Sequence, residues 1–94
     1  MWWKIIYYYL YLFERARGIK DVVKASELYM FVKQIDYLKL YRRPMDLVID
    51  LCQGEAVRVR WVGNDWEIEV IKPGLYMRYI EEGRELLRNL ERGD

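Results

Sequence analysis

The side chains with the clearest capacity for chemistry in this sequence are carboxylates. Asp46 and Asp50 stand four residues apart, a spacing that places both on one face of a helix. Two such carboxylates could hold a magnesium ion if further oxygen ligands joined them. The neighbouring sequence supplies neither a nucleophile nor a phosphate clamp, so we interpret the pair as a solvated helix face.

A second group, Glu67, Glu69 and Lys72, resembles the acidic cluster of a nuclease, but its lysine follows Glu69 by three residues rather than two. The chain has no histidine and one cysteine, Cys52. This composition removes Ser–His and Cys–His nucleophile pairs, a histidine metal site and a zinc cluster within one chain. Cys52 itself is expected to be a core side chain. We therefore predict that the protein is not an enzyme and has no catalytic residues, no metal site, no cofactor and no small-molecule substrate.

Length and composition predict one globular domain over residues 1–94. A second core would need on the order of 50 more residues, and the 53% of hydrophobic residues can fill a single core. The chain has no threonine, few amide side chains and 33% charged residues, a composition typical of a heat-adapted protein. A single cysteine and no secretory signal favour the cytoplasm. The apolar run over residues 2–13 is shorter than the roughly 20 residues that span a membrane, so we do not expect a membrane partner.

The elements that must position these groups are predicted by periodicity. Residues 3–17 are apolar on nearly every side, which indicates a buried helix, although a buried strand fits the tyrosines and isoleucines too. A second amphipathic helix is predicted to begin near Ser26 as its N-cap. A third runs from Pro44 to about Gln53, with a narrow acidic outer stripe, and a last helix follows Pro73.

Residues 56–71 carry the strongest local pattern, because one register around a Gly63-Asn64 turn satisfies both faces of a hairpin. That register places Trp61 opposite Trp66 on one face. On the other face it places Arg58 opposite Glu69 and Arg60 opposite Glu67.

The predicted order of elements is helix, short strand, helix, helix, hairpin and helix. This order resembles that of a winged helix-turn-helix domain. The resemblance is carried by Val23-Lys24-Ala25-Ser26-Glu27-Leu28, which looks like the family's short strand and the start of its second helix, and by Glu69-Val70-Ile71-Lys72-Pro73-Gly74, which looks like the strand leading into its last helix. It implies an α+β, winged helix-like fold with a two-stranded hairpin, the wing, before a C-terminal helix. Many such domains bind DNA through the third helix and others are protein contact modules, so function must be argued from surfaces.

A small transcriptional regulator would need cations that meet phosphates. The candidates are Lys39, Arg42 and Arg43 before the third helix and Arg15, Arg17, Lys20 and Lys24 around the end of the first. If the two clusters converge, they could hold DNA. The net charge of +1, the acidic third helix and the glutamate partners of the hairpin arginines argue against this function.

The alternative is a protein interaction module, either a homodimer or a subunit of a larger assembly, that does not bind DNA. Aromatic side chains dominate interface energetics, and a first helix that is apolar all round needs cover. The candidate contact residues are Trp2, Trp3, Tyr7, Tyr8 and Tyr11. The sequence leaves both functions open.

Overall fold

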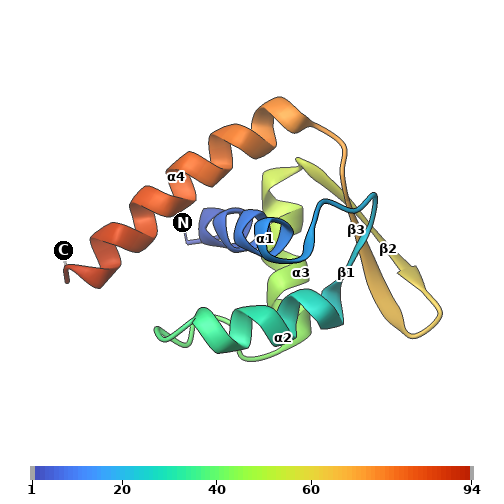
Figure 1. Cartoon of the computed structure of the whole chain (residues 1–94), viewed down its shortest axis with the longest axis horizontal. Coiled ribbons are helices and arrows are strands. Elements are labelled where there is room, and N and C mark those ends of the chain that lie inside the picture. Colours follow the sequence, from blue (N-terminus) through green and yellow to red (C-terminus); the bar gives the residue numbers. More distant parts are fainter. Residues whose placement is uncertain (1, 94) are drawn as a thin grey trace.

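The computed structural model describes residues 2–93, and within that range the chain forms four helices and a three-stranded antiparallel sheet (Figure 1). The elements in chain order are α1 (Lys4–Arg17), β1 (Val23–Lys24), α2 (Ala25–Ile35), α3 (Pro44–Gly54), β2 (Val57–Val62), β3 (Asp65–Val70) and α4 (Pro73–Glu91). The predicted α+β class is confirmed.

Residues 3–17 are mainly helical, which excludes the buried strand. In Figure 1 the α1 helix lies between α4 and α2, so one small domain does surround much of an apolar helix. Close contact with α4 depends on Gly83, because a Cβ there would lie 2.1 Å from the carbonyl oxygen of Lys4. Gly83 therefore permits close helix packing and does not break α4, which continues through it.

The hairpin register is confirmed, including Trp61 opposite Trp66, Arg60 opposite Glu67 and Arg58 opposite Glu69. The hairpin was predicted to stand as two strands before the C-terminal helix, but in the structure it is part of a three-stranded sheet. β1 pairs with β3 on the edge away from β2, giving the order β1-β3-β2. The sheet therefore ties the segment after α1 to the hairpin.

Ser26 does not act as the N-cap of α2, because the helix begins at Ala25 and Lys24 holds the cap position. The backbone N–H and hydroxyl of Ser26 both donate to the carboxylate of Asp65 at the start of β3. The serine predicted to start a helix thus fastens that helix to the hairpin.

Of the three residues predicted on the outer face of the third helix, only Gln53 is exposed. Met45 and Ile49 are 42% and 50% exposed, and Cys52 is exposed rather than in the core. The α3 helix buries only the arc of Leu47, Val48, Leu51 and Gly54. Asp46 and Asp50 are half-buried instead of forming the outer stripe. The outer face of α3 is therefore largely apolar.

Within residues 2–93 no helix has the length and apolar character that crossing a membrane would require.

Candidate functional site

Asp46 on α3 contacts two of the three cationic residues before this helix, one of them through its backbone alone. Asp46 accepts hydrogen bonds from the backbone N–H groups of Arg42 and Arg43 at 3.1 and 3.0 Å, and from the Arg43 guanidinium at 3.1 Å. Burial alone would raise the pKa of Asp46, but these hydrogen bonds outweigh it and lower the pKa. Lys39 is exposed in the preceding loop. A carboxylate thus stands among the first cluster of cations.

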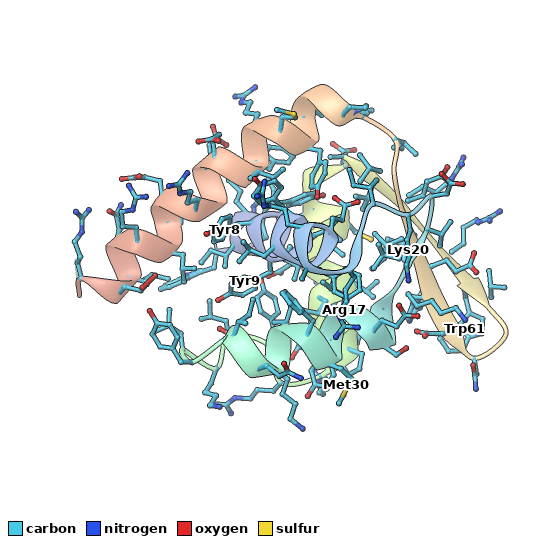
Figure 2. The ribbon with its side chains drawn as sticks, in the orientation of Figure 1. Tyr8, Tyr9, Arg17, Lys20, Met30 and Trp61 are labelled. Atoms are coloured by element: carbon cyan, nitrogen blue, oxygen red, sulfur yellow. The ribbon has the colours of Figure 1, made fainter. Side chains whose placement is uncertain are left out.

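The cations at the end of α1 lie against its own aromatic side chains. The Arg15 guanidinium donates to the Tyr11 hydroxyl at 3.1 Å and lies 5.6 Å from the ring centroid, and that of Arg17 lies 5.8 Å from the Phe13 ring. The two lysines of this cluster, Lys20 and Lys24, are exposed, and the Lys20 ammonium lies 4.0 Å from Glu27. Figure 2 shows Arg17 between α1 and α2, with Lys20 nearer the sheet.

The α2 helix lies between residues of the two clusters. Its Phe31 packs edge to face on Phe13 of α1, whereas its Tyr29 hydroxyl donates to the Arg42 carbonyl at 2.7 Å. Residues two positions apart on a helix point about 160° apart, so Phe31 and Tyr29 mark opposite flanks of α2. Arg17 and the Arg42 backbone are therefore on opposite flanks of α2.

The hairpin arginines are paired as their register requires. The Arg58 guanidinium lies 2.6 Å from the Glu69 carboxylate and that of Arg60 lies 3.7 Å from the Glu67 carboxylate. These pairs also engage the two glutamates of the group that resembles a nuclease cluster. Among residues 2–93 no group of three or more potential ligands of the His, Cys, Asp or Glu type is arranged to hold a metal ion.

The five aromatic candidates fall into three different environments. Tyr7 is fully buried, and its hydroxyl donates to the Leu51 carbonyl of α3 at 2.5 Å. Tyr8 and Tyr11 are half-buried and stacked on each other. Trp3 packs on Tyr7 and Tyr79, and Trp2 is 48% exposed. The residues predicted as one interface therefore serve a core, a surface and a pocket.

The surface environment is a groove between α1 and α4 of about 490 Å³. Its apolar lining residues are Tyr8, Tyr11, Leu12, Ile19, Tyr76, Met77 and Ile80, and its charged ones are Glu14, Arg15, Glu81 and Arg84. We call this feature the α1/α4 groove. The sequence identified Tyr8 and Tyr11 as contact residues and Arg15 as a cation for phosphate, but it did not bring them together with Ile19 and Met77, which lie far apart along the chain.

The pocket environment lies beside the start of α1. A cavity of about 540 Å³ is lined by Trp2, Trp3, Leu40, Tyr41, Asp50 and Gln53. Asp50 accepts a hydrogen bond from the Tyr41 hydroxyl at 2.8 Å. Burial, followed by the charge of Asp50, raises the pKa of Tyr41, which keeps its hydroxyl protonated as the donor. We call this feature the Trp2/Asp50 pocket.

Sequence reasoning missed the Trp2/Asp50 pocket, because its residues come from three separated segments. The only available signal was the pair of tryptophans that precedes α1.

In comparisons with known proteins, no family model, no curated protein and no solved structure matches this chain.

Proposed function

We propose that this chain is a winged helix-like domain that works as a protein contact module and assembles with a second copy of itself. Four helices, a three-stranded antiparallel sheet and a hairpin before α4 are compatible with that arrangement. The fold alone does not favour contact over DNA binding. The surfaces make the difference.

The observation that carries the proposal is the apolar α1/α4 groove. Ile19 at its edge is 87% exposed and Met77 on α4 is 66% exposed. Fully burying such a side chain contributes about 1.5 to 3 kcal/mol. The stacked pair of Tyr8 and Tyr11 adds aromatic surface of the kind that is enriched in the centres of interfaces. The groove thus offers a continuous surface that gains from being covered.

The charges around the groove support a second copy as the partner. Arg15 and Arg84 on its border are matched in number by Glu14 and Glu81. A two-fold contact brings the same surface of both chains together, so each surface must be complementary to itself. A border with equal numbers of both charges meets this condition, whereas a border of one sign would repel its copy.

Duplex DNA binding has weaker support from the same surfaces. The helix that would enter the major groove exposes Met45, Ile49 and Cys52, which offer no donors that read base edges, and among its exposed side chains only the amide of Gln53, near its end, could do so. The basic residues that would hold phosphates include two on opposite flanks of α2. DNA binding by Lys39, Arg42 and Arg43 stays a prediction, which fluorescence anisotropy with duplex DNA can test.

Analytical ultracentrifugation over a wide concentration range tests the assembly. We expect the parent chain to form a dimer, and Met77→Glu to shift the equilibrium towards monomer by at least about tenfold, since a buried charge loses more than the 1.4 kcal/mol that a factor of ten requires. Met30→Glu is the matched control, because Met30 is 56% exposed and lies on the outer side of α2, away from the groove (Figure 2).

A parent chain that stays monomeric at millimolar concentration would refute the proposal, and so would equal weakening by both substitutions. Fluorescence anisotropy with duplex DNA at low salt tests the other function, because phosphate contacts are strongest there. Tight binding that Arg42→Ala abolishes would favour DNA as the partner.

A further inference from the structure

The Trp2/Asp50 pocket combines a carboxylate with aromatic walls. Asp50 and Gln53 project from α3, Leu40 and Tyr41 come from the loop before that helix, and Trp2 and Trp3 precede α1. The cavity of about 540 Å³ falls within the roughly 300 to 1,000 Å³ range of small-molecule sites. It is separate from the residues that line the α1/α4 groove.

Asp50 gives the pocket its charge. Its Oδ2 is fixed by the Tyr41 hydroxyl at 2.8 Å, and Tyr41 in turn is only 6% exposed, so the carboxylate is held on a rigid support. The residues that line the cavity include no lysine and no arginine. The pocket therefore favours a cation over an anion or a neutral group of the same shape.

The aromatic walls suit the same kind of ligand. The face of a tryptophan ring attracts a cation within about 6 Å of its centre. Trp3 already has such a contact within the chain, because the Lys4 ammonium lies 5.4 Å from its ring centroid. Lys4 is also 2.9 Å from the Glu82 carboxylate, so its charge is partly balanced and does not dominate the pocket.

We propose that the Trp2/Asp50 pocket binds an alkylated ammonium group, with Trp2 and Trp3 against its alkyl groups and Asp50 opposite its charge. The group has two chemical sources, which are a free quaternary amine of the choline type and a methylated lysine side chain of another protein.

The balance of acceptors favours an alkylated ammonium over a primary one. A primary ammonium has three N–H donors that must be satisfied when it is buried. Asp50 and Gln53 are the side chains of the lining that offer oxygen acceptors besides the Tyr41 hydroxyl, and one Asp50 oxygen is already engaged. A quaternary ammonium donates no hydrogen bond and instead contacts apolar and aromatic surface.

Titration calorimetry with matched ligands tests the proposal. Choline is compared with 3,3-dimethylbutan-1-ol, which has the same shape without the charge, and with a short peptide that carries trimethyllysine. We expect choline or the peptide to bind at least about tenfold more tightly than the neutral alcohol, because cation–π attraction and the carboxylate both require charge. Preference between choline and the peptide identifies the source.

Substitutions locate the binding in this pocket. Asp50→Asn and Trp2→Ala should each weaken binding of the charged ligand by about tenfold, which is the scale of one desolvated cation–π or ionic contact. Trp61→Ala is the control, because Trp61 is 58% exposed and lies in the hairpin, far from Tyr8 and the start of α1 (Figure 2). Equal effects of Trp2→Ala and Trp61→Ala would overturn the assignment.

The chain's own terminal ammonium has related chemistry, so the titrations use the chain with a free and with an acetylated amino terminus. Charge-dependent binding by either form supports the proposal. Equal affinity for choline and the neutral alcohol, or no binding by both forms, overturns it.

Discussion

Replacing Gly83 with alanine tests how tightly α1 and α4 are packed. A Cβ at this position would lie 2.1 Å from the Lys4 carbonyl oxygen and 2.7 Å from the Lys4 carbonyl carbon. An ordinary carbon-to-oxygen contact is about 3.3 Å or longer, so the helices would have to separate by about 1 Å. Both obstructing atoms belong to the backbone of a helix, which cannot swing aside as a flexible side chain can.

Two opposing effects set the size of the change. Alanine is about 1 kcal/mol more favourable than glycine in a helix interior. Overpacking a tight contact costs about 1 to 3 kcal/mol, and occasionally more, and the clash here is with rigid backbone. We therefore expect Gly83→Ala to lower the free energy of unfolding by about 1 to 2 kcal/mol, even though it improves the helix propensity of α4.

Guanidinium denaturation followed by circular dichroism measures this change. The comparison belongs in the Met77→Glu background, because dimer formation would otherwise add its own stabilisation. Gly74→Ala in the first turn of the same helix is the control, since its Cβ would meet nothing within 4 Å and should leave stability unchanged or raise it by up to about 1 kcal/mol. If Gly83→Ala proves as stable as Gly74→Ala, the close contact of α1 with α4 is refuted.

Three further substitutions examine the polar interactions. Burial raises the pKa of Asp50, although the Tyr41 hydrogen bond opposes the shift, so ionising Asp50 in the folded state lowers stability once the pH exceeds the unfolded pKa of about 3.9. Asp50→Asn should therefore raise the unfolding midpoint at pH 7 but not at pH 3. A lower midpoint of the variant at pH 7 would contradict this. Asp36 is 3% exposed and accepts hydrogen bonds from the Tyr41 backbone N–H at 2.9 Å and from a tyrosine hydroxyl of α1 at 3.2 Å. Asp36→Ala should therefore lower the free energy of unfolding, measured by chemical denaturation, by about 1 to 3 kcal/mol for each buried donor that it leaves unsatisfied. Glu69→Ala removes the exposed ion pair with Arg58 and should cost less than about 1 kcal/mol in the same assay; a larger loss would show that the pair supports the sheet.

The hairpin could be predicted from sequence because its evidence is local and two-sided. A shift of one residue would move Trp61 and Trp66 to opposite faces and separate Arg58 from Glu69. The third strand could not be derived in the same way. Val23 and Lys24 are only two residues, and they join the sheet because the segment after α1 passes beside β3.

The exposure of α3 was mispredicted because periodicity shows which residues share a face, but not how much of that face the domain covers. Met45, Ile49 and Cys52 continue the apolar arc in sequence, yet they lie beyond the arc that contacts the core. The Asp46 side chain lies at the start of the helix, where it accepts hydrogen bonds from backbone N–H groups. The Asp50 side chain accepts a hydrogen bond from a tyrosine hydroxyl of the preceding loop. Neither interaction follows from helical spacing.

The aromatic residues at the start of the chain illustrate the same limit. The sequence predicted one contact surface, but successive residues on a helix point about 100° apart, so neighbours must enter different environments. Tyr7 faces the core, Tyr8 lies at the α1/α4 groove, and Trp2 lines the Trp2/Asp50 pocket. Aromatic composition indicates that these side chains make extensive contacts, but only the packing of the four helices decides which environment each one enters.

This division makes the two proposed activities separable. The groove and the pocket share no lining residue, so a charge introduced at Met77 should weaken the dimer and leave the affinity for choline unchanged. Trp2→Ala should do the reverse. Effects at sites that share no contacts usually add within about 0.5 kcal/mol, which corresponds to less than a threefold change in either equilibrium. A larger cross-effect in ultracentrifugation or calorimetry would mean that α1 transmits binding at its start to the surface it shares with α4, and the two sites would then have to be treated as one.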